Sequence, residues 1–255
     1  MNNVVITQLK NQSGRLRDWI LYHYEEGFET FIIYDDYSED DTVKEIEEIK
    51  NKYNINIIIK YTDGIGGKYG IEDCKNSESY GMDISFHKRL CRSYTQGNNY
   101  VKSINPNAIC AIIDVDEFLV TSENKKAIDV IKEEMGRLNS KQLVINSFDI
   151  DDGFTIGDWY TTQDICSNRW SYEKTMKTHF NARYKSVIVS EDLEEVVQAH
   201  ILKWADNPII ENFRVYDFEK LRIHHFRKPT LPIKIEFDKD FTMINKMKII
   251  RDKYE

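Results

Sequence analysis

Apolar and polar residues follow two different periods along the first 146 residues. Short runs rich in Ile, Val, Leu and Phe alternate with segments whose apolar residues recur at i, i+3 and i+4, which predicts strands alternating with helices. The predicted strands are residues 3–9, 29–35, 54–63, 108–120 and 142–146, and the predicted helices are residues 15–27, 38–53, 77–98 and 124–138. Gly27 is the expected stop of the first helix and Ser38 the expected N-cap of the second.

This alternation predicts an α/β fold. Near-continuous Ile and Val runs are typical of parallel strands buried on both faces, so we expect a mostly parallel, twisted sheet with helices on both faces. In such sheets ligands bind at the carboxyl ends of the strands. Acidic residues at those ends are therefore the first candidates for a site.

The pattern becomes less regular after residue 146. Short strands are predicted at 185–190, 195–202 and 213–226, and a polar, amphipathic terminal helix at 237–255. No linker rich in Pro, Gly or Ser separates the parts, so the sequence predicts one domain over 1–255. Its parts are residues 1–146, residues 147–228 and a C-terminal extension, residues 229–255, that is expected to be helical.

The composition bears on which ligands the protein is expected to bind and on where in the cell it is expected to be. The 43 Asp and Glu residues outnumber the 35 Lys and Arg residues, giving a net charge of −8, which disfavours nucleic-acid binding. The four cysteines contain no CxxC pair, so they are expected to be reduced thiols rather than zinc ligands. No signal peptide and no transmembrane run is recognised, which predicts a cytoplasmic protein. A peripheral membrane contact and the oligomeric state stay open.

The stretch "AIIDVDEFLV", residues 111–120, places Asp114, Asp116 and Glu117 inside an apolar strand. An ionised carboxylate that is buried without a partner lowers the stability of the fold by roughly several kcal/mol. If the strand continues, Asp114 and Asp116 share one face, where Mg²⁺ or Mn²⁺ carrying a phosphorylated ligand would offset their repulsion. The alternative is a strand edge that exposes the acids to water.

The acidic stretch that comes first in the chain, "YDDYSEDDT" (residues 34–42), lies at the end of the strand at 29–35. Asp35 and Asp36 are placed to hydrogen-bond the base or the ribose hydroxyls of a nucleoside. Alternatively, Ser38 caps the next helix while Asp40 and Asp41 complement its dipole.

These two stretches together resemble a known family. The segment "LKNQSGRLRDWILYHYEEGFETFIIYDDYSEDDT", followed about 70 residues later by "IIDVDEFLV", resembles the family 2-like glycosyltransferases of GT-A fold, in the subgroup with an Asp-x-Asp-Glu-Phe motif. The later "RYKSVIV", "AH" and "IHHFRKP" are similar to that subgroup's C-terminal motifs. Three features depart from its pattern: Gln12 stands where Glu is usual, Asp36 where Asn is common, and "IHHF" where His-Tyr is common.

The resemblance implies roles for particular residues. Asp114 and Asp116 match the acids that contact metal, diphosphate and ribose, and Asp35 or Asp36 matches the acid that contacts the nucleoside. Thr7 and Lys10 lie on the first strand end, where the nucleotide is cradled. The role of Glu117 is left open. Either His224 or His225 matches a histidine that completes the metal shell.

The implied activity is transfer of a sugar from a nucleotide-diphosphate sugar to a hydroxyl of a glycan, a lipid-linked sugar or a protein, with Mn²⁺ or Mg²⁺. Inversion of configuration is expected, and retention, which would not need a base, stays open. Residues 1–146 would then bind the nucleotide sugar and residues 147–228 the acceptor. An inverting transfer needs a base, and Asp152 is favoured over the other acids of "NSFDIDDGFTIGD". Lys10, Arg92 and Arg183 are candidate phosphate contacts.

Several aromatic and histidine side chains have two interpretations. The aromatic residues Trp159, Tyr160, Trp170 and Tyr172 suit either sugar stacking or core packing. His23, at helical spacing from Trp19, is expected in the core.

Two other classes of function are compatible with the acids. One is a metal-dependent nucleotidyltransferase or phosphohydrolase, against which stands the lack of a phosphate-binding Gly-x-x-x-x-Gly-Lys motif. The other is a non-catalytic relative that keeps the fold as a nucleotide-sugar-binding module, against which stands the intact Asp-x-Asp.

Overall fold

The structure is a computed structural model of the 255-residue chain. It describes residues 1–62, 84–121, 125–150, 166–167, 184–198, 201–204, 214–215, 220–226, 238–239 and 242–255. The strands are β1 (Asn3–Leu9), β2 (Thr30–Asp35), β3 (Asn56–Tyr61), β4 (Ile109–Ile112), β5 (Glu117–Val120), β6 (Gln142–Ile150), β7 (Cys166–Ser167), β8 (Tyr184–Val189), β9 (Leu193–Gln198), β10 (Ile201–Trp204), β11 (Arg214–Val215), β12 (Arg222–Phe226) and β13 (Asp238–Lys239). The helices are α1 (Leu16–Glu25), α2 (Thr42–Tyr53), α3 (Ile84–Ile104), α4 (Ala127–Leu138) and α6 (Thr242–Tyr254), with a 3-10 turn at Ser190–Asp192.

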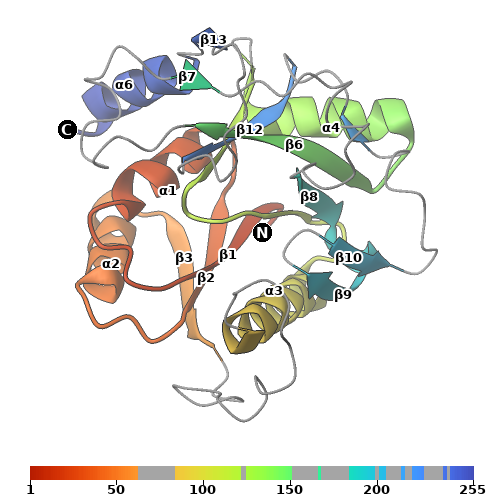
Figure 1. The fold of residues 1–255 in the computed structure, drawn as a ribbon, viewed down its shortest axis with the longest axis horizontal. Helices are drawn as coiled ribbons and strands as arrows, with labels where there is room; N and C mark the ends of the chain where they lie inside the picture. The colour runs from red at the N-terminus through yellow and green to blue at the C-terminus, as the bar shows by residue number, and fades with distance from the viewer. Residues whose placement is uncertain are drawn as a thin grey trace.

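A parallel core of four strands organises the sheet. β3, β2, β1 and β4 lie side by side and run in one direction. β8 pairs antiparallel to both β4 and β6, so it is the reversed strand between them. The path of the main sheet is β13-β7-β6-β8-β4-β1-β2-β3 (Figure 1). The predicted α/β fold on a mostly parallel sheet is confirmed.

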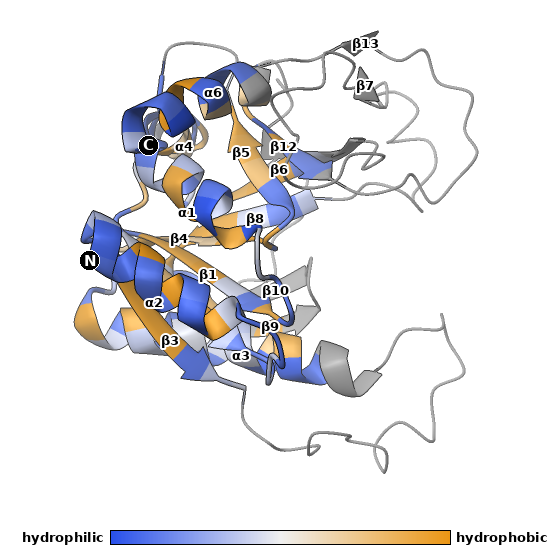
Figure 2. Ribbon diagram, turned by 90° about the vertical axis from the view of Figure 1, so that its left-hand side faces the viewer, coloured by the Kyte–Doolittle hydropathy of each residue, from blue (hydrophilic) through white to orange (hydrophobic). Residues whose placement is uncertain are grey.

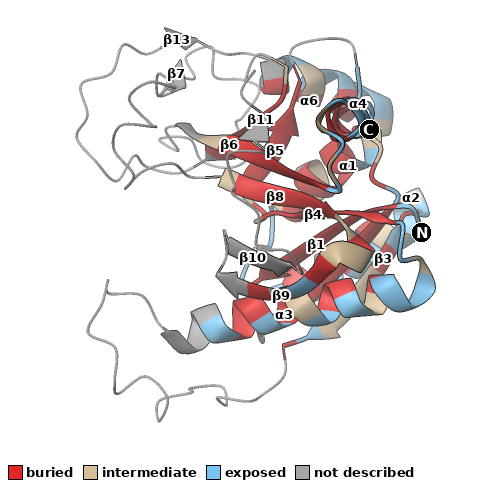
Figure 3. Cartoon of the chain, turned by 90° about the vertical axis from the view of Figure 1, so that its right-hand side faces the viewer, coloured by how far each residue is buried: buried red, intermediate tan, exposed pale blue. Residues whose placement is uncertain are grey.

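Helices cover both faces of this sheet, as the sequence predicts. Along β1, Val5 and Leu9 pack in one apolar cluster with α1, α2, α4 and α6, whereas Val4 and Ile6 pack in another with α3 and β9. Every residue of β1, β2 and β4 is buried (Figure 3). The helices turn their polar faces outward (Figure 2). Burial on both faces explains why these strands read as continuous apolar runs.

Of the two predicted helix ends, the stop of α1 is confirmed and the N-cap of α2 is wrong. Gly27 has φ +98 just after α1, so the predicted glycine stop is confirmed. The predicted cap at Ser38 is wrong: α2 begins at Thr42, after Asp41, without a side-chain cap. The Ser38 hydroxyl instead accepts a hydrogen bond from the backbone N–H of Asn11 at 2.9 Å.

The predicted strand over 108–120 is wrong in one respect that matters for the site. The chain leaves β4 after Ile112, turns, and begins β5 at Glu117. β5 then pairs antiparallel with β12 rather than extending β4. The predicted strand over 195–202 is likewise two strands, β9 and β10, which form an antiparallel pair of their own.

The predicted strand over 213–226 is also two strands, β11 and β12, and several elements end at other residues than predicted. α3 continues to Ile104 and β6 to Ile150, both further than predicted, while the start expected for α3 lies outside the described residues. The predicted terminal helix begins only at Thr242, since Asp238–Lys239 forms β13. α6 is tied to α1 by the ion pairs of Arg251 with Asp18 and of Lys253 with Glu25.

Candidate functional site

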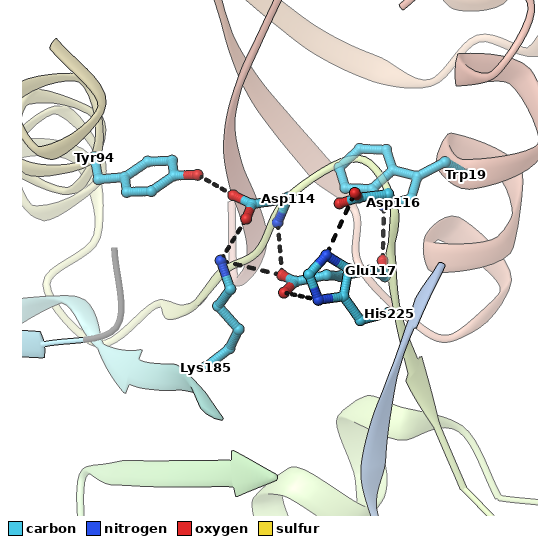
Figure 4. A network of polar contacts seen from close by, with 7 residues as sticks. All are labelled: Trp19, Tyr94, Asp114, Asp116, Glu117, Lys185 and His225. Atoms are coloured by element: carbon cyan, nitrogen blue, oxygen red, sulfur yellow. Dashed lines mark hydrogen bonds and ion pairs between the residues drawn. The ribbon is translucent and has the colours of Figure 1, made fainter. Parts of the chain in front are cut away.

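The turn between β4 and β5 is closed by its own hydrogen bonds. The backbone N–H of Glu117 donates to the carbonyl of Asp114 at 3.1 Å, and the N–H of Asp114 donates to the Glu117 carboxylate at 2.9 Å. The expectation that Asp114 and Asp116 share a strand face is therefore wrong, because alternation of faces requires an extended backbone. The turn points the two carboxylates at different partners (Figure 4).

Asp114 is held by two side chains from different elements. The hydroxyl of Tyr94, on α3, donates to one carboxylate oxygen at 2.7 Å, and the ammonium of Lys185, on β8, donates to the other at 2.7 Å. Burial raises the pKa of Tyr94, and the neighbouring Asp114 raises it further, so Tyr94 stays a neutral donor.

Lys185 also compensates the second acid of the turn. Its side chain is 1% exposed and lies 3.2 Å from the carboxylate of Glu117, which is equally buried. Burial by itself lowers the pKa of Lys185, but the charges of Asp114 and Glu117 outweigh it and leave the pKa raised, so the ammonium stays charged. Burial raises the pKa of Glu117, against the opposing effect of Lys185. The offset for these two acids is thus a buried lysine.

Asp116 has a different partner, on β12. Its carboxylate lies 3.3 Å from Nε2 of His225, whose Nδ1 is 3.7 Å from Glu117. The side chain of Asp116 is 33% exposed. Strand alternation turns His224 away, and its Nε2 accepts a hydrogen bond from the Arg222 guanidinium at 3.0 Å. Of the two candidate histidines, His225 is the one beside the acidic turn.

The first acidic stretch is compensated much more completely. The Asp36 carboxylate accepts hydrogen bonds from Nε and Nη2 of Arg89 at 2.8 and 2.9 Å, and from the Thr62 hydroxyl at 2.7 Å. Asp35 accepts from the backbone N–H of Ser38 at 3.1 Å. Both acids are buried. They sit at the carboxyl end of β2, as expected, but these contacts are internal to the protein.

Side chains of the first acidic stretch also fix the loop that follows β1. The hydroxyls of Ser38 and Thr42 and the carboxylates of Asp40 and Glu45 accept hydrogen bonds from four successive backbone N–H groups, those of Asn11, Gln12, Ser13 and Gly14. This loop therefore presents few free amide donors, and the acids near it serve as local acceptors.

The remaining predicted residues are dispersed. Thr7, on β1, is fully buried and its hydroxyl has no hydrogen-bond partner in the described structure, whereas Lys10 is exposed. Arg92 is exposed on α3. Outside the described residues lie Asp152, Arg183 and the aromatic residues Trp159, Tyr160, Trp170 and Tyr172.

The sequence did not predict the partners of the two acidic stretches, among them Tyr94, Lys185 and Arg89. Each comes from an element distant in sequence from the acid that it contacts. Lys185 leaves the clearest trace, because "YKSVIV" places a lysine inside an otherwise apolar strand, and a buried lysine requires a carboxylate partner.

The donor atoms at the turn suit a divalent cation only in part. In the part of the chain that the structure describes, no group of three or more His, Cys, Asp or Glu side chains is arranged to hold a metal. Asp116 and His225 form a pair whose donor atoms are 3.3 Å apart. Adjacent ligands of a cation with bonds of about 2.1 Å lie about 3 Å apart, so this pair fits. Asp114 is engaged by Lys185 and Tyr94 instead.

Comparison with known proteins gives one sequence relative and several remote structural likenesses. A 52-residue stretch is 44% identical to a glycosyltransferase family 92 protein of Ricinus communis, covering 20% of this chain and 9% of that protein. No family model matches the chain. Part of this chain is thus similar to a protein named as a glycosyltransferase, and the chain spans less than a tenth of that relative.

Solved structures resemble the chain only distantly. HddC of Yersinia pseudotuberculosis superposes with a TM-score of 0.37 at 10% identity, over all of both chains. A mycobacterial protein gives 0.41 at 8% identity, over 99% of this chain and 74% of its own. A putative glucose-1-phosphate thymidylyltransferase of Bacillus anthracis, crystallised with sucrose, gives 0.38 at 7% identity, over 99% and 96%. TM-scores below 0.5 do not establish a common fold.

The helices give no sign of a membrane span. Among the helices within the described ranges, none combines the length and the apolar character that crossing a bilayer requires.

Proposed function

We propose that this chain is a metal-dependent glycosyltransferase of GT-A type that uses a nucleotide-diphosphate sugar. The observation that carries the proposal is the pair formed by the partly exposed Asp116 and the buried His225, next to a turn whose other two acids are fixed by Lys185. The turn follows β4, at the carboxyl end of the parallel strands, where ligands bind in such sheets. The similarity to a glycosyltransferase over 52 residues supports the same class.

Asp116 and His225 are the residues we assign to Mn²⁺ or Mg²⁺. An oxygen and an imidazole nitrogen at this separation suit Mn²⁺ in particular, and diphosphate oxygens and water would complete the shell. Bound there, the cation supplies charge neutralisation for the diphosphate leaving group. Asp114 then has a structural role, because its ion pair with Lys185 fixes one end of the turn.

The acceptor side of the reaction depends on residues outside the described ranges. Asp152 stays our candidate base for an inverting transfer to a hydroxyl of a glycan, a lipid-linked sugar or a protein. Thr7, Lys10, Asp35 and Asp36 stay candidates for the nucleotide. Of these, Lys10 is exposed, so a phosphate can reach it without rearrangement of the loop.

The first test is nucleotide-dependent thermal stability. UDP, GDP, CDP, ADP and dTDP are added with and without Mn²⁺ to the wild type, to Asp116→Asn and to Asp129→Asn, a control at an exposed acid on α4. A ligand at 100 times its Kd stabilises the native state by about 2.7 kcal/mol. We expect one nucleotide to stabilise the wild type and Asp129→Asn only with Mn²⁺, and Asp116→Asn not at all.

Two outcomes would contradict the proposal. If no nucleotide stabilises the wild type, the turn does not bind a metal–diphosphate. If the matching nucleotide sugar yields a sugar 1-phosphate or a nucleoside monophosphate instead of the nucleoside diphosphate, the reaction cleaves the phosphoanhydride bond, by nucleotidyl transfer or by hydrolysis. Release of the nucleoside diphosphate with transfer of the sugar is the expected result.

A further inference from the structure

Strand β5 pairs with a neighbouring strand along one edge, and side chains of α1 complete the other. β12 occupies the first edge. On the second, the indole N–H of Trp19 donates to the carbonyl of Glu117 at 2.9 Å, and the hydroxyl of Tyr22 donates to the carbonyl of Leu119 at 3.1 Å. The backbone N–H of Leu119 donates to Nε2 of His23 at 3.4 Å.

The three side chains therefore make the hydrogen bonds to β5 that a further strand would otherwise make. A buried backbone group without a partner costs about 1–3 kcal/mol, so β5 could not lie at this depth with that edge unpaired. The Nδ1–H of His23 donates to the carbonyl of Trp19 at 2.9 Å. Nε2 therefore carries no proton and accepts the hydrogen bond from Leu119. The fully buried ring of His23 packs on Phe118.

Trp19 differs from the other two because it contacts the residue that ends the acidic turn. Glu117 closes that turn through its backbone N–H and through its carboxylate, and it directly follows Asp116. Its carbonyl points toward α1, while its carboxylate points toward Lys185 (Figure 4). Tyr22 and His23 act two residues further along the strand, away from the turn.

We propose that Trp19 is a positioning residue for the acidic turn: its indole N–H fixes Glu117 and thereby the direction of the Asp116 carboxylate toward His225. The effect on ligand binding rests on the function proposed above, whereas the effect on the geometry of the turn does not. Partners behind a metal ligand typically change metal affinity about 10- to 100-fold when they are removed, which sets the expected size.

The experiment compares Trp19→Phe with two controls. Tyr22→Phe removes a hydrogen bond to the same strand at Leu119. Phe31→Leu removes ring volume next to Trp19, whose ring centroid is 6.0 Å from that of Phe31, without touching a β5 hydrogen bond. Amide hydrogen exchange at Asp114 and Glu117 reports on the turn, and the Kd for Mn²⁺ with the stabilising nucleoside diphosphate reports on the site.

We expect Trp19→Phe to speed exchange at Asp114 and Glu117 at least tenfold relative to Phe31→Leu and to raise the Kd about tenfold. Both controls should leave the Kd within about twofold of wild type. If Trp19→Phe and Phe31→Leu give the same exchange at the turn, the positioning role is wrong. If exchange changes as expected while the wild type binds no nucleotide, the positioning role stands and the proposed function fails.

Discussion

The two acidic stretches of this chain look alike in sequence and differ in how their charges are compensated. In the first, residues 34–42, Asp36 has a two-point ion pair with Arg89, and Asp35 and Asp40 accept backbone hydrogen bonds. In the second, residues 111–120, Lys185 contacts Asp114 and Glu117, whereas Asp116 lies beside the histidine His225 and keeps 33% of its side chain exposed. This partly exposed carboxylate is what makes the second stretch the candidate site.

Replacing Lys185 with Met should have the largest effect, because it leaves Asp114 and Glu117 without their shared cation. Removing one partner of a buried pair costs about 3–5 kcal/mol. The control is Lys141→Met, at an ion pair with Glu191 where the lysine side chain is 55% exposed; solvent screens such a pair, so its loss should destabilise the protein far less. Urea unfolding at pH 7.5 measures both. Equal costs for the two variants would remove the distinction between the stretches.

The pH dependence of stability tests the hydrogen bonds that Trp19, Tyr22 and His23 of α1 make to β5, the strand within the second acidic stretch. Burial lowers the pKa of His23 to about 4 from 6.5. The unfolded chain therefore binds a proton between these values that the native state excludes, so stability is complete above pH 6.5 and is lost as the pH falls toward 4. The loss attributable to His23 is about 3 kcal/mol. His23→Gln, which does not titrate, should flatten the dependence of the unfolding free energy on pH in that window.

Asp36→Asn is expected to destabilise the protein by about 2–3 kcal/mol, since Arg89 loses its charged partner. If Asp36 is purely structural, the Mn²⁺ dependence of nucleotide binding should persist in this variant. Calorimetric titration with the stabilising nucleotide separates the two roles. A loss of nucleotide affinity without a loss of stability would show that Asp36 contacts the nucleoside, which would make the first stretch part of the site.

Asp40→Ala should have the smallest effect. Its carboxylate accepts hydrogen bonds from the backbone N–H groups of Ser13, in the loop after β1, and of Thr42, the first residue of α2, an arrangement that resembles an N-cap. Loss of such a cap costs about 1 kcal/mol. Chemical denaturation checks this value. A cost above that of Asp36→Asn would mean that the loop after β1 depends on Asp40 more than the geometry indicates.

The sequence alone predicted those features that depend on residues close together along the chain. The core strands were predicted because their apolar runs are continuous, and Gly27 was predicted to stop α1 because only glycine adopts its positive φ without strain. The break between β4 and β5 was not predicted, because "IIDVDEFLV" fits a strand equally well until the hydrogen bonds of the turn are known. Ser38 was misassigned because its hydroxyl bonds a different loop.

The candidate site was predictable only from its acids. Asp114 and Asp116 are visible in the sequence, but the residues that decide their roles come from elsewhere. Lys185 is 71 positions from Asp114, and Arg89 is 53 positions from Asp36. Partners that meet only in the folded sheet leave no periodic signal, which is why the choice between His224 and His225 also needed the register of β12 against β5.

The reversed strand β8 has a consequence for how the chain matures on the ribosome. The acidic turn is synthesised about 70 residues before the lysine that neutralises it, and still longer before His225. Pairings so distant in sequence form late, after local helices and neighbouring parallel strands. We expect nascent chains that stop short of β8 to carry a turn whose acids repel each other. The candidate site would then be completed only when β8 and β12 join the sheet.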